Sequence, residues 1–418
     1  MMSKQASIVF VEQFYYPEGW GGAQIPLDIT TALAQAGMGV TVICGRDQYV
    51  PAVSRELTDP RDFGVKIRYV PRYLLRRETW KGTMAQIGFC VAASAMLFRR
   101  RPSIVVVQTN PPLIVVAMSL SASLLRCPLV IIAQDLYPEV MVAHGMIGER
   151  SLRGRFLTRI FGLAYRRATA VVSLGPRMTS RLLQKRVALT RICEISNWAT
   201  GGLGLVTGSA NCFRRDWGLT GKFVLLYSGN MGVAHDVDTV LRAIGAARGE
   251  LSNLRLVVVG QGGRIAQAEQ LSLELGIVEL VQFRPLVSAE LLPQTLGIAD
   301  IALVSLRPGF EGLVVPSKLL GHMARGVPTL YVGPRDGDVA QLIDKSGGGL
   351  NITNGDVAGM AGLLVELAHD PRRLREMGES AQRYYESHLS RANGLRHYEN
   401  LINRVLVEVN GNLGRGSR

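Results

Sequence analysis

Short runs of mostly apolar, often β-branched residues recur along both halves of the 418-residue chain. Longer segments with helical periodicity separate them. Continuously apolar strands between helices predict parallel sheets that are covered on both faces. The predicted strands are residues 8–11, 40–44, 104–108, 129–133 and 170–174 in the first half, and residues 224–228, 255–260, 281–284, 301–305 and 329–332 in the second.

The two series of strands predict two doubly wound, Rossmann-like α/β domains that face each other across a cleft. A chain of 418 residues suits two domains of about 200 residues each. Residues 195–219 are rich in Gly, Ser, Thr and Asn and show no clear period, so the inter-domain connection is expected there. We therefore expect a first domain over 1–200, a second over 201–388 and a last helix over 389–412.

Composition excludes several classes of protein. Apolar residues make up 47% of the chain and charged residues 19%, which is enough material for packed cores and argues against general disorder. The five cysteines are dispersed and none forms a Cys-x-x-Cys pair: Cys44, Cys90, Cys127, Cys193 and Cys212. This set predicts reduced thiols in a cytoplasmic protein, not a disulfide framework or a zinc site.

The net charge of +14 lies almost entirely in the first half, because residues 1–200 carry 25 Lys and Arg against 12 Asp and Glu, or +13. In residues 150–167, apolar side chains recur at helical spacing among arginines, including Arg153, Arg155 and Arg159. Such a basic amphipathic helix predicts a surface for anionic lipid headgroups. The alternative is a solvated helix whose apolar side packs on the core. Nucleic acid is not an expected partner, because no recognition motif accompanies the arginines.

No segment clearly predicts a membrane span. The longest nearly apolar run, residues 82–98, has 17 residues, whereas a spanning helix takes about 20. A buried or interface-lying helix is the favoured interpretation. The first residues lack the pattern of a signal peptide. We expect a peripheral protein on the cytoplasmic face of the cell membrane.

The strongest functional signal lies between residues 301 and 328. An apolar strand is followed by a loop and by a helix that opens at Pro316, Ser317 and Lys318. The start of a helix offers unpaired backbone N–H groups, and a lysine adds a positive charge, so this pattern suits a phosphate. The alternative is an ordinary strand-loop-helix crossover with a surface lysine.

Three further glycine-rich loops follow predicted strands. Gly21 and Gly22 follow the first strand; Ser228, Gly229 and Asn230 begin the second loop, and Gln261 and Gly262 lie in the third. Glycines at such positions let a backbone approach a pyrophosphate closely. None of the loops has the G-x-G-x-x-G pattern, so NAD is not indicated. Several anion-friendly strand exits in one predicted sheet favour a nucleoside-diphosphate site.

These motifs together resemble the GT-B glycosyltransferases of family 4. The resemblance rests on the Gly-Gly pair near the N-terminus, on SGNMG, GQG and VQF, on IADIALV, and on PSK…MARGVP. QDLYPE (134–139) and NW (197–198) resemble the branch that makes bacterial surface polysaccharides, such as the colanic-acid and O-antigen fucosamine transferases. The resemblance implies transfer of a sugar from a nucleoside-diphosphate sugar, usually with retention, to a saccharide acceptor that is expected to be lipid-linked. It also implies that the last helix crosses back to the first domain.

The chain departs from this family in several places. Many members have arginine and lysine where Asn230 and His235 stand, and a glutamate for the ribose where Gly321 stands. Gln134 stands where many members have a histidine. Lys318 is expected to supply part of the lost attraction for the diphosphate, and Arg264 is a further candidate, or else a plain surface arginine. His235 and His322 lie near the expected site by position, but each can equally be a structural histidine.

The expected site follows from these positions. Asp135 and Glu139 come directly after a predicted strand and, if helical, share one face, where they would bind the acceptor or assist its deprotonation; a capping role is the alternative for Asp135. With Lys318 they form the expected catalytic set. The expected donor-binding residues are Gly21, Gly22, Ser228, Gly229, Asn230, His235, Gln261, Gly262, Arg284, Glu311, Ser317 and Lys318. No metal and no cofactor beyond the nucleotide sugar are expected, because the aspartates of the DGD sequence, Asp336 and Asp338, follow Gly333 and Pro334 and have the pattern of a turn.

Two other functions stay open at this point. A degenerate member, without the usual Arg, Lys and Glu, would bind nucleotide sugar or membrane as a non-catalytic scaffold. A nucleotide-sugar epimerase shares a two-domain plan but needs no lipid acceptor. Release of nucleoside diphosphate with and without an isoprenoid-linked acceptor discriminates among the three.

Overall fold

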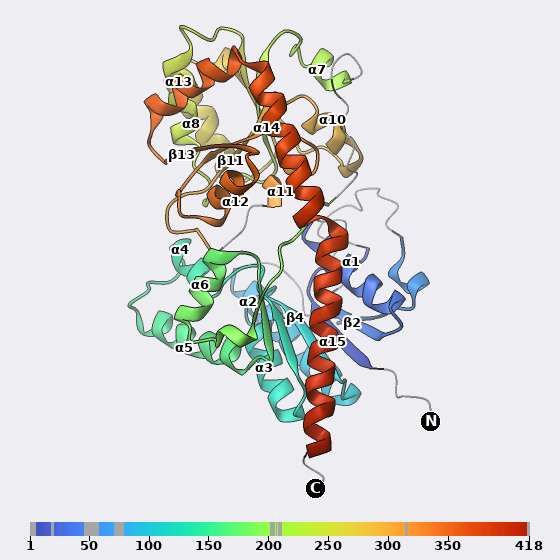
Figure 1. The fold of residues 1–418 in the computed structure, drawn as a ribbon. Helices are drawn as coiled ribbons and strands as arrows, with labels where there is room; N and C mark the ends of the chain where they lie inside the picture. Colours follow the sequence, from blue (N-terminus) through green and yellow to red (C-terminus); the bar gives the residue numbers. More distant parts are fainter. Residues whose placement is uncertain are drawn as a thin grey trace. The chain divides into compact units, whose positions relative to one another are not determined.

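The computed structural model describes residues 6–17, 21–45, 58–70, 79–200, 205, 207, 211–313 and 317–415. The chain forms two compact units (Figure 1). The first unit comprises Met1–Ser196, Gly312–Val314 and Ala392–Arg418, and the second comprises Asn197–Glu311 and Val315–Arg391. The first unit thus takes in a short segment from the second half of the chain and all but the first residue of the last helix.

The first unit contains a parallel sheet of seven strands in the order β3-β2-β1-β4-β5-β6-β7. Its register aligns Ile8 of β1 with Val40 of β2 on one side and with Ile104 of β4 on the other. The strands are β1 (Ser7–Glu12), β2 (Gly39–Cys44), β3 (Lys66–Tyr69), β4 (Ile104–Gln108), β5 (Leu129–Ile132), β6 (Ala170–Ser173) and β7 (Ile192–Glu194).

Helices cover this sheet. Helix α3 contacts both α2 and α5, so these three lie side by side. The helices are α1 (Gly21–Gln35), α2 (Thr79–Arg100), α3 (Ile114–Leu125), α4 (Glu139–Ala143), α5 (Leu152–Arg167), α6 (Pro176–Gln184) and α15 (Arg391–Arg415), with short 3-10 turns at Pro60–Phe63 and Leu189–Arg191. Among the described residues, no helix combines the length and the hydropathy that a membrane crossing requires.

The second unit contains a parallel sheet of six strands in the order β10-β9-β8-β11-β12-β13. The strands are β8 (Phe223–Ser228), β9 (Leu254–Val259), β10 (Val281–Arg284), β11 (Ile301–Ser305), β12 (Thr329–Val332) and β13 (Gly349–Ile352). The helices are α7 (Cys212–Asp216), α8 (Asp238–Ala247), α9 (Ile265–Glu274), α10 (Leu292–Leu296), α11 (Ser317–Met323), α12 (Asp338–Ser346), α13 (Val357–Ala368) and α14 (Pro371–Tyr384), with short turns at Val278–Leu280, Ala289–Leu291 and Tyr385–Leu389.

The predicted fold class is confirmed, since both sheets are parallel, doubly wound and covered by helices. All ten predicted strands are present with boundaries within a residue or two. Strands β3, β7 and β13 were not predicted. Each lies at the edge of its sheet, where one side of the strand has no neighbour and continuous apolar sequence is not required.

Each sheet reverses its strand order once. The reversal falls between β1 and β4 in the first unit and between β8 and β11 in the second. In open parallel sheets, ligands bind beyond the carboxyl ends of the strands at such a reversal. A ligand site of the second unit is therefore expected at the loops after β8 and β11.

Candidate functional site

The side chain of Lys318, from α11, reaches the loop that follows β8. Its ammonium nitrogen Nζ lies 2.8 Å from the hydroxyl of Tyr227, 2.9 Å from the carbonyl oxygen of Asn230 and 3.0 Å from Nε2 of His235. The Tyr227 hydroxyl donates to the same Asn230 carbonyl at 2.8 Å. Nζ also lies 4.5 Å from the centre of the Tyr227 ring. All three hydrogen-bonding positions of the amino group are thus directed at groups of this loop and of β8.

No carboxylate is among these contacts of Lys318 in the described part of the chain. Burial without a counter-ion lowers the pKa of Lys318 to about 7. Burial, and then the neighbouring Lys318, lowers the pKa of His235 to about 4, so the imidazole is neutral at physiological pH. The site therefore holds a half-buried basic group that contacts no carboxylate of the described residues.

His235 can match either charge state of Lys318. Its Nδ1 lies 3.1 Å from the backbone N–H of Gly232 and 3.2 Å from the Gly232 carbonyl oxygen. With Nδ1 protonated, the ring donates to this carbonyl and Nε2 accepts from an ammonium. With Nε2 protonated, Nδ1 accepts from the Gly232 N–H and the ring donates to a neutral amine. The tautomer of His235 can thus follow the protonation of Lys318.

Arg264 holds the same loop from the other side. Its guanidinium donates to the His235 carbonyl at 2.8 Å, to Asp238 at 2.9 Å and to Gln267 at 3.0 Å. The residue is only 6% exposed, so it is not a plain surface arginine. Its guanidinium is committed to shaping the loop and the start of α8.

The glycine-rich loops after β8 and β9 pack against each other. A Cβ atom on Gly260 would meet the carbonyl oxygen of Gly229 at 2.0 Å, and one on Gly262 would meet the Met231 carbonyl oxygen at 2.4 Å. The N–H of Met231 donates to the Gln261 carbonyl at 2.7 Å. Close backbone contact therefore explains Gly260 and also Gly262, which the sequence pattern linked only to the approach of a phosphate.

In the first unit, Asp135 follows β5 and lies before α4. Its backbone N–H and that of Gln134 both donate to the hydroxyl of Thr109, which follows β4, at 3.1 Å. The carboxyl hydrogen-bonds to Tyr137, and burial raises its pKa to about 6. A buried carboxylate at a strand exit with a pKa near neutrality has the properties of a general base.

The expectation that Asp135 and Glu139 share a helix face is wrong. Helix α4 starts only at Glu139, because Pro138 disfavours a helical Tyr137 and a turn separates Asp135 from the helix. Glu139 forms an ion pair with Lys185, which also donates to the Tyr137 carbonyl. The Glu139 carboxylate is thus committed to a buried lysine.

Two family models match the chain: residues 21–198 fit a glycosyl transferase 4-like domain, and residues 211–384 fit the glycosyl transferases group 1. The chain belongs to glycosyltransferase family 4. This family assignment confirms the resemblance that the sequence motifs carried.

This glycosyltransferase is similar to curated proteins of bacterial polysaccharide synthesis. It is 29% identical over 271 residues to the probable glycosyltransferase WbjE of Pseudomonas aeruginosa. The aligned residues make up 64% of this chain and 66% of that protein. It is 27% identical over 235 residues to the putative colanic acid biosynthesis glycosyl transferase WcaI of Escherichia coli K12. Here the aligned residues make up 54% of this chain and 56% of that protein. The matched part thus spans about two-thirds of the length of WbjE and about half of the length of WcaI.

Solved structures share the fold of this glycosyltransferase. Anabaena HepE in complex with UDP and glucose superposes with a TM-score of 0.73 at 13% identity, over 96% of this chain and 100% of that one. WaaG, a glycosyltransferase involved in lipopolysaccharide biosynthesis, gives 0.69 at 16% identity, over 94% and 98%. At such low identity the likeness concerns the fold, which is GT-B.

The other predicted donor-binding residues of this glycosyltransferase are distributed around the second unit, except for Gly21 and Gly22, which form the first turn of α1 in the first unit. Arg284 stacks over Trp217 at 5.3 Å, and its carbonyl accepts from Gly260. Glu311 accepts from the Gly309 N–H at 2.6 Å. Ser228 ends β8 and Ser317 is exposed at the start of α11, while Pro316 lies outside the described residues.

His322 has a structural environment. It is 1% exposed, and its Nδ1 lies 3.3 Å from the Thr329 hydroxyl. Burial lowers its pKa to about 3, so it stays neutral. Within the described ranges, no three His, Cys, Asp or Glu side chains gather as a metal-ligand set; the expectation of metal-free chemistry stays a prediction.

Two contributors were missed in the sequence. Tyr227 looked like one more apolar strand residue, although its position directly before SGN places its hydroxyl beside the loop. Lys185 carried no signal, because only the fold brings it to Glu139, 46 residues away.

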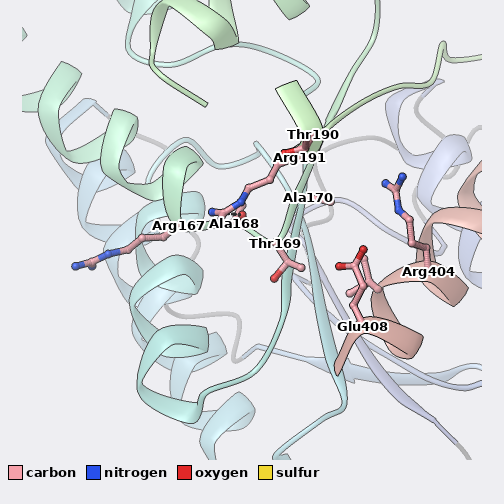
Figure 2. A pocket seen from close by; sticks show the side chains of 9 residues that line it. Arg167, Ala168, Thr169, Ala170, Thr190, Arg191, Arg404 and Glu408 are labelled. Atoms are coloured by element: carbon pink, nitrogen blue, oxygen red, sulfur yellow. Dashed lines mark hydrogen bonds between the residues drawn. The ribbon is translucent and has the colours of Figure 1, made fainter. Parts of the chain in front are cut away.

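A separate pocket of about 360 Å³ lies in the first unit, at the starts of β6 and β7 and beside α15. Figure 2 shows Glu408 beside this pocket and the guanidinium groups of Arg167 and Arg404 extending in different directions. None of the predicted site residues lines it, and it lies at the opposite end of the strands from Asp135.

Proposed function

We propose that this glycosyltransferase transfers a sugar from a nucleoside-diphosphate sugar to a lipid-linked saccharide acceptor in the synthesis of bacterial surface polysaccharide. The observation that carries the donor is Lys318, a half-buried basic group with three neutral partners at the strand reversal of the second unit. A buried cation is costly unless an anion pairs with it. A diphosphate supplies that anion.

The relatives support this choice of substrates. The HepE structures contain UDP, UDP-glucose, or UDP with glucose. WcaI is named for colanic acid synthesis, and WaaG is described as acting in lipopolysaccharide biosynthesis. A nucleoside-diphosphate sugar as donor and a lipid-linked saccharide as acceptor are consistent with these relatives.

In the proposed reaction, the bond between the anomeric carbon and the diphosphate oxygen breaks, and the acceptor oxygen bonds to that carbon. Lys318 would exchange one of its present contacts for a phosphate oxygen and offset the leaving charge. Asp135 would accept the proton of the acceptor hydroxyl. Glu139 has no direct part, because its carboxylate pairs with Lys185. We propose that no metal takes part and that the anomeric configuration is retained.

We propose a peripheral location on the cytoplasmic face of the membrane, where lipid-linked acceptors are elongated. Arg153, Arg155 and Arg159 of α5 are exposed and available to anionic headgroups.

The test measures release of nucleoside diphosphate from radiolabelled sugar donors, with and without an isoprenoid-linked acceptor. Release that depends on acceptor, with label appearing in the lipid fraction, supports the transferase. Binding of donor with no release of nucleoside diphosphate in either case favours a non-catalytic scaffold. Asn230 and His235 support that alternative, because many family members have Arg and Lys at these positions. Proton NMR of the product reports retention through the anomeric coupling.

A further inference from the structure

Helices α2, α3 and α5 expose a large apolar surface on the first unit. Of the large apolar side chains exposed in the described part of the chain, half belong to these three helices. They are Met84, Ile87, Val91 and Phe98 on α2, Leu120 and Leu124 on α3, and Leu152, Phe156 and Leu163 on α5. We call this set the apolar face.

The spacing shows that each helix contributes one outward stripe. On α2 the positions follow as i, i+3, i+7 and i+14, on α3 as i and i+4, and on α5 as i, i+4 and i+11. The opposite side of each helix packs on the sheet through residues such as Phe89, Met118 and Phe161, which are fully buried. Helix α2 is therefore apolar on both its buried and its exposed side, a pattern that water does not favour.

The three stripes lie next to one another. Helix α3 contacts both α2 and α5, so the three stripes lie on neighbouring helices of the first unit. Leu152 and Leu124 are 85% and 67% exposed. Monomeric soluble proteins rarely leave a contiguous apolar surface of this extent uncovered.

The charges around the apolar face identify its occupant. The sequences of α2, α3 and α5 contain no aspartate or glutamate. Arginines stand at the ends of α2 and α3, as Arg99, Arg100 and Arg126, and along α5, as Arg153, Arg155 and Arg159. Apolar side chains that point outward, bordered by cations and free of anions, match a bilayer surface with anionic headgroups above an apolar interior.

We propose that the apolar face inserts into the interfacial layer of an anionic membrane, so that the first unit docks through α2, α3 and α5 together and not through the arginines of α5 alone. This inference deepens the proposed membrane partner and rests on that part of the proposed function. It adds that apolar insertion, which salt does not screen, holds the protein once the arginines have attracted it.

The test is co-sedimentation of the full chain with vesicles of 70% phosphatidylcholine and 30% phosphatidylglycerol at 0.1 M and 0.5 M NaCl. Binding of the wild type should weaken with salt but persist at 0.5 M. The triple variant Val91→Ser, Leu124→Ser, Phe156→Ser removes one side chain from each stripe and should bind at least about tenfold less at both salt concentrations. The variant Arg153→Gln, Arg155→Gln, Arg159→Gln should lose binding mainly at 0.1 M.

A matched control changes three exposed apolar residues of the second unit: Leu273→Ser, Val278→Ser, Leu286→Ser. It should bind as the wild type does. The proposal would be overturned if the variant at Val91, Leu124 and Phe156 bound vesicles as strongly as this control does. It would also be overturned by a wild-type dimer that this variant converts to monomer without a change in vesicle binding, because the occupant would then be a second copy.

A transfer assay in detergent, without vesicles, keeps the two proposals apart. If the wild type binds vesicles through the apolar face but transfers no sugar, the docking stands and the proposed transferase activity fails. If it transfers sugar in detergent but the apolar variant still binds vesicles, the docking fails and the activity stands.

Discussion

Nζ of Lys318 lies 3.0 Å from Nε2 of His235, so two basic groups share one half-buried site in the second unit. Both cannot be charged there at moderate cost, and the lower pKa of His235, about 4, leaves Lys318 as the group that carries charge near neutral pH. Among the described residues, Lys318 is thus the titratable cation at this place, where many family members have an arginine and a lysine.

Replacing Lys318 by methionine should weaken donor binding. The variant keeps the volume of the side chain and removes the only ammonium that contacts Asn230 and His235 in the described residues. We expect the donor dissociation constant from calorimetry to rise at least about tenfold, the loss of one charge-assisted hydrogen bond. Lys345→Met, on the exposed face of α12, is the control and should bind normally. Equal constants for wild type and Lys318→Met would contradict the phosphate contact.

Donor affinity should depend on pH through Lys318. Its pKa is about 7 in the free protein, below its ordinary value, and a bound diphosphate raises it. Above pH 7 binding must therefore include protonation, and the apparent dissociation constant should rise by up to about tenfold per pH unit. Nucleotide sugars suit this test because their diphosphate does not titrate there. Calorimetry at pH 8 in HEPES and in Tris buffer, neither of which competes as a phosphate, should report uptake of up to about one proton.

The variant Lys318→Arg provides the control for this pH dependence. A guanidinium stays charged throughout, so its affinity should be flat between pH 7 and 9 even if it is weaker overall. A wild type as flat as the arginine variant would show that Lys318 is charged before the donor arrives.

Asp135→Asn should abolish transfer without abolishing donor binding. If the carboxylate takes the acceptor proton, kcat should fall by about 10²-fold to 10⁴-fold, whereas donor binding in the second unit should be unchanged. Burial raises the pKa of Asp135 to about 6, so the wild-type rate should fall as pH drops below 6, where the base becomes protonated. Asp62→Asn, at an exposed position, is the control. Full activity of Asp135→Asn would leave Asp135 a structural role.

The pair of Glu139 and Lys185 should prove structural. Glu139→Ala alone leaves a buried lysine without its partner and should lower the free energy of unfolding by about 3 kcal/mol. Glu139→Gln combined with Lys185→Met should recover part of that loss in urea unfolding and should keep transfer activity. Loss of activity in a stable double variant would restore Glu139 to the catalytic set.

The sequence predicted the fold better than it predicted the contacts of the site. Continuous apolar runs identify central strands because both of their faces are buried, which is why β1, β4 and β8 were found, whereas the edge strands β3, β7 and β13 lack that signal. Glycines after the predicted strands identified the loops of the candidate site, but they did not reveal which contact requires each glycine. That Gly260 touches the backbone of Gly229 depends on how two loops pack, which sequence spacing does not reveal.

The pairing of charged groups was least predictable. Helical spacing put Asp135 and Glu139 on one face, but a turn at Tyr137 and Pro138 precedes the helix. Glu139 then pairs with Lys185, which comes from a distant part of the chain. Arg264 was expected to be either a candidate phosphate-binding residue or a plain surface arginine, yet three hydrogen bonds hold its buried guanidinium against the loop after β8. Such partners are set by long-range packing.

The contact between the two glycine loops can be tested by a matched pair of substitutions. In Gly260→Ala the new Cβ would lie 2.0 Å from the Gly229 carbonyl oxygen, so the loops after β8 and β9 must move apart. We expect a loss of about 2–3 kcal/mol in the free energy of unfolding and a weaker donor affinity, since the same loop carries Asn230 and His235. In Gly263→Ala the new Cβ has no atom within 4 Å, so stability should change by less than about 0.5 kcal/mol. Equal effects of the two alanines would show that the loops do not depend on this contact.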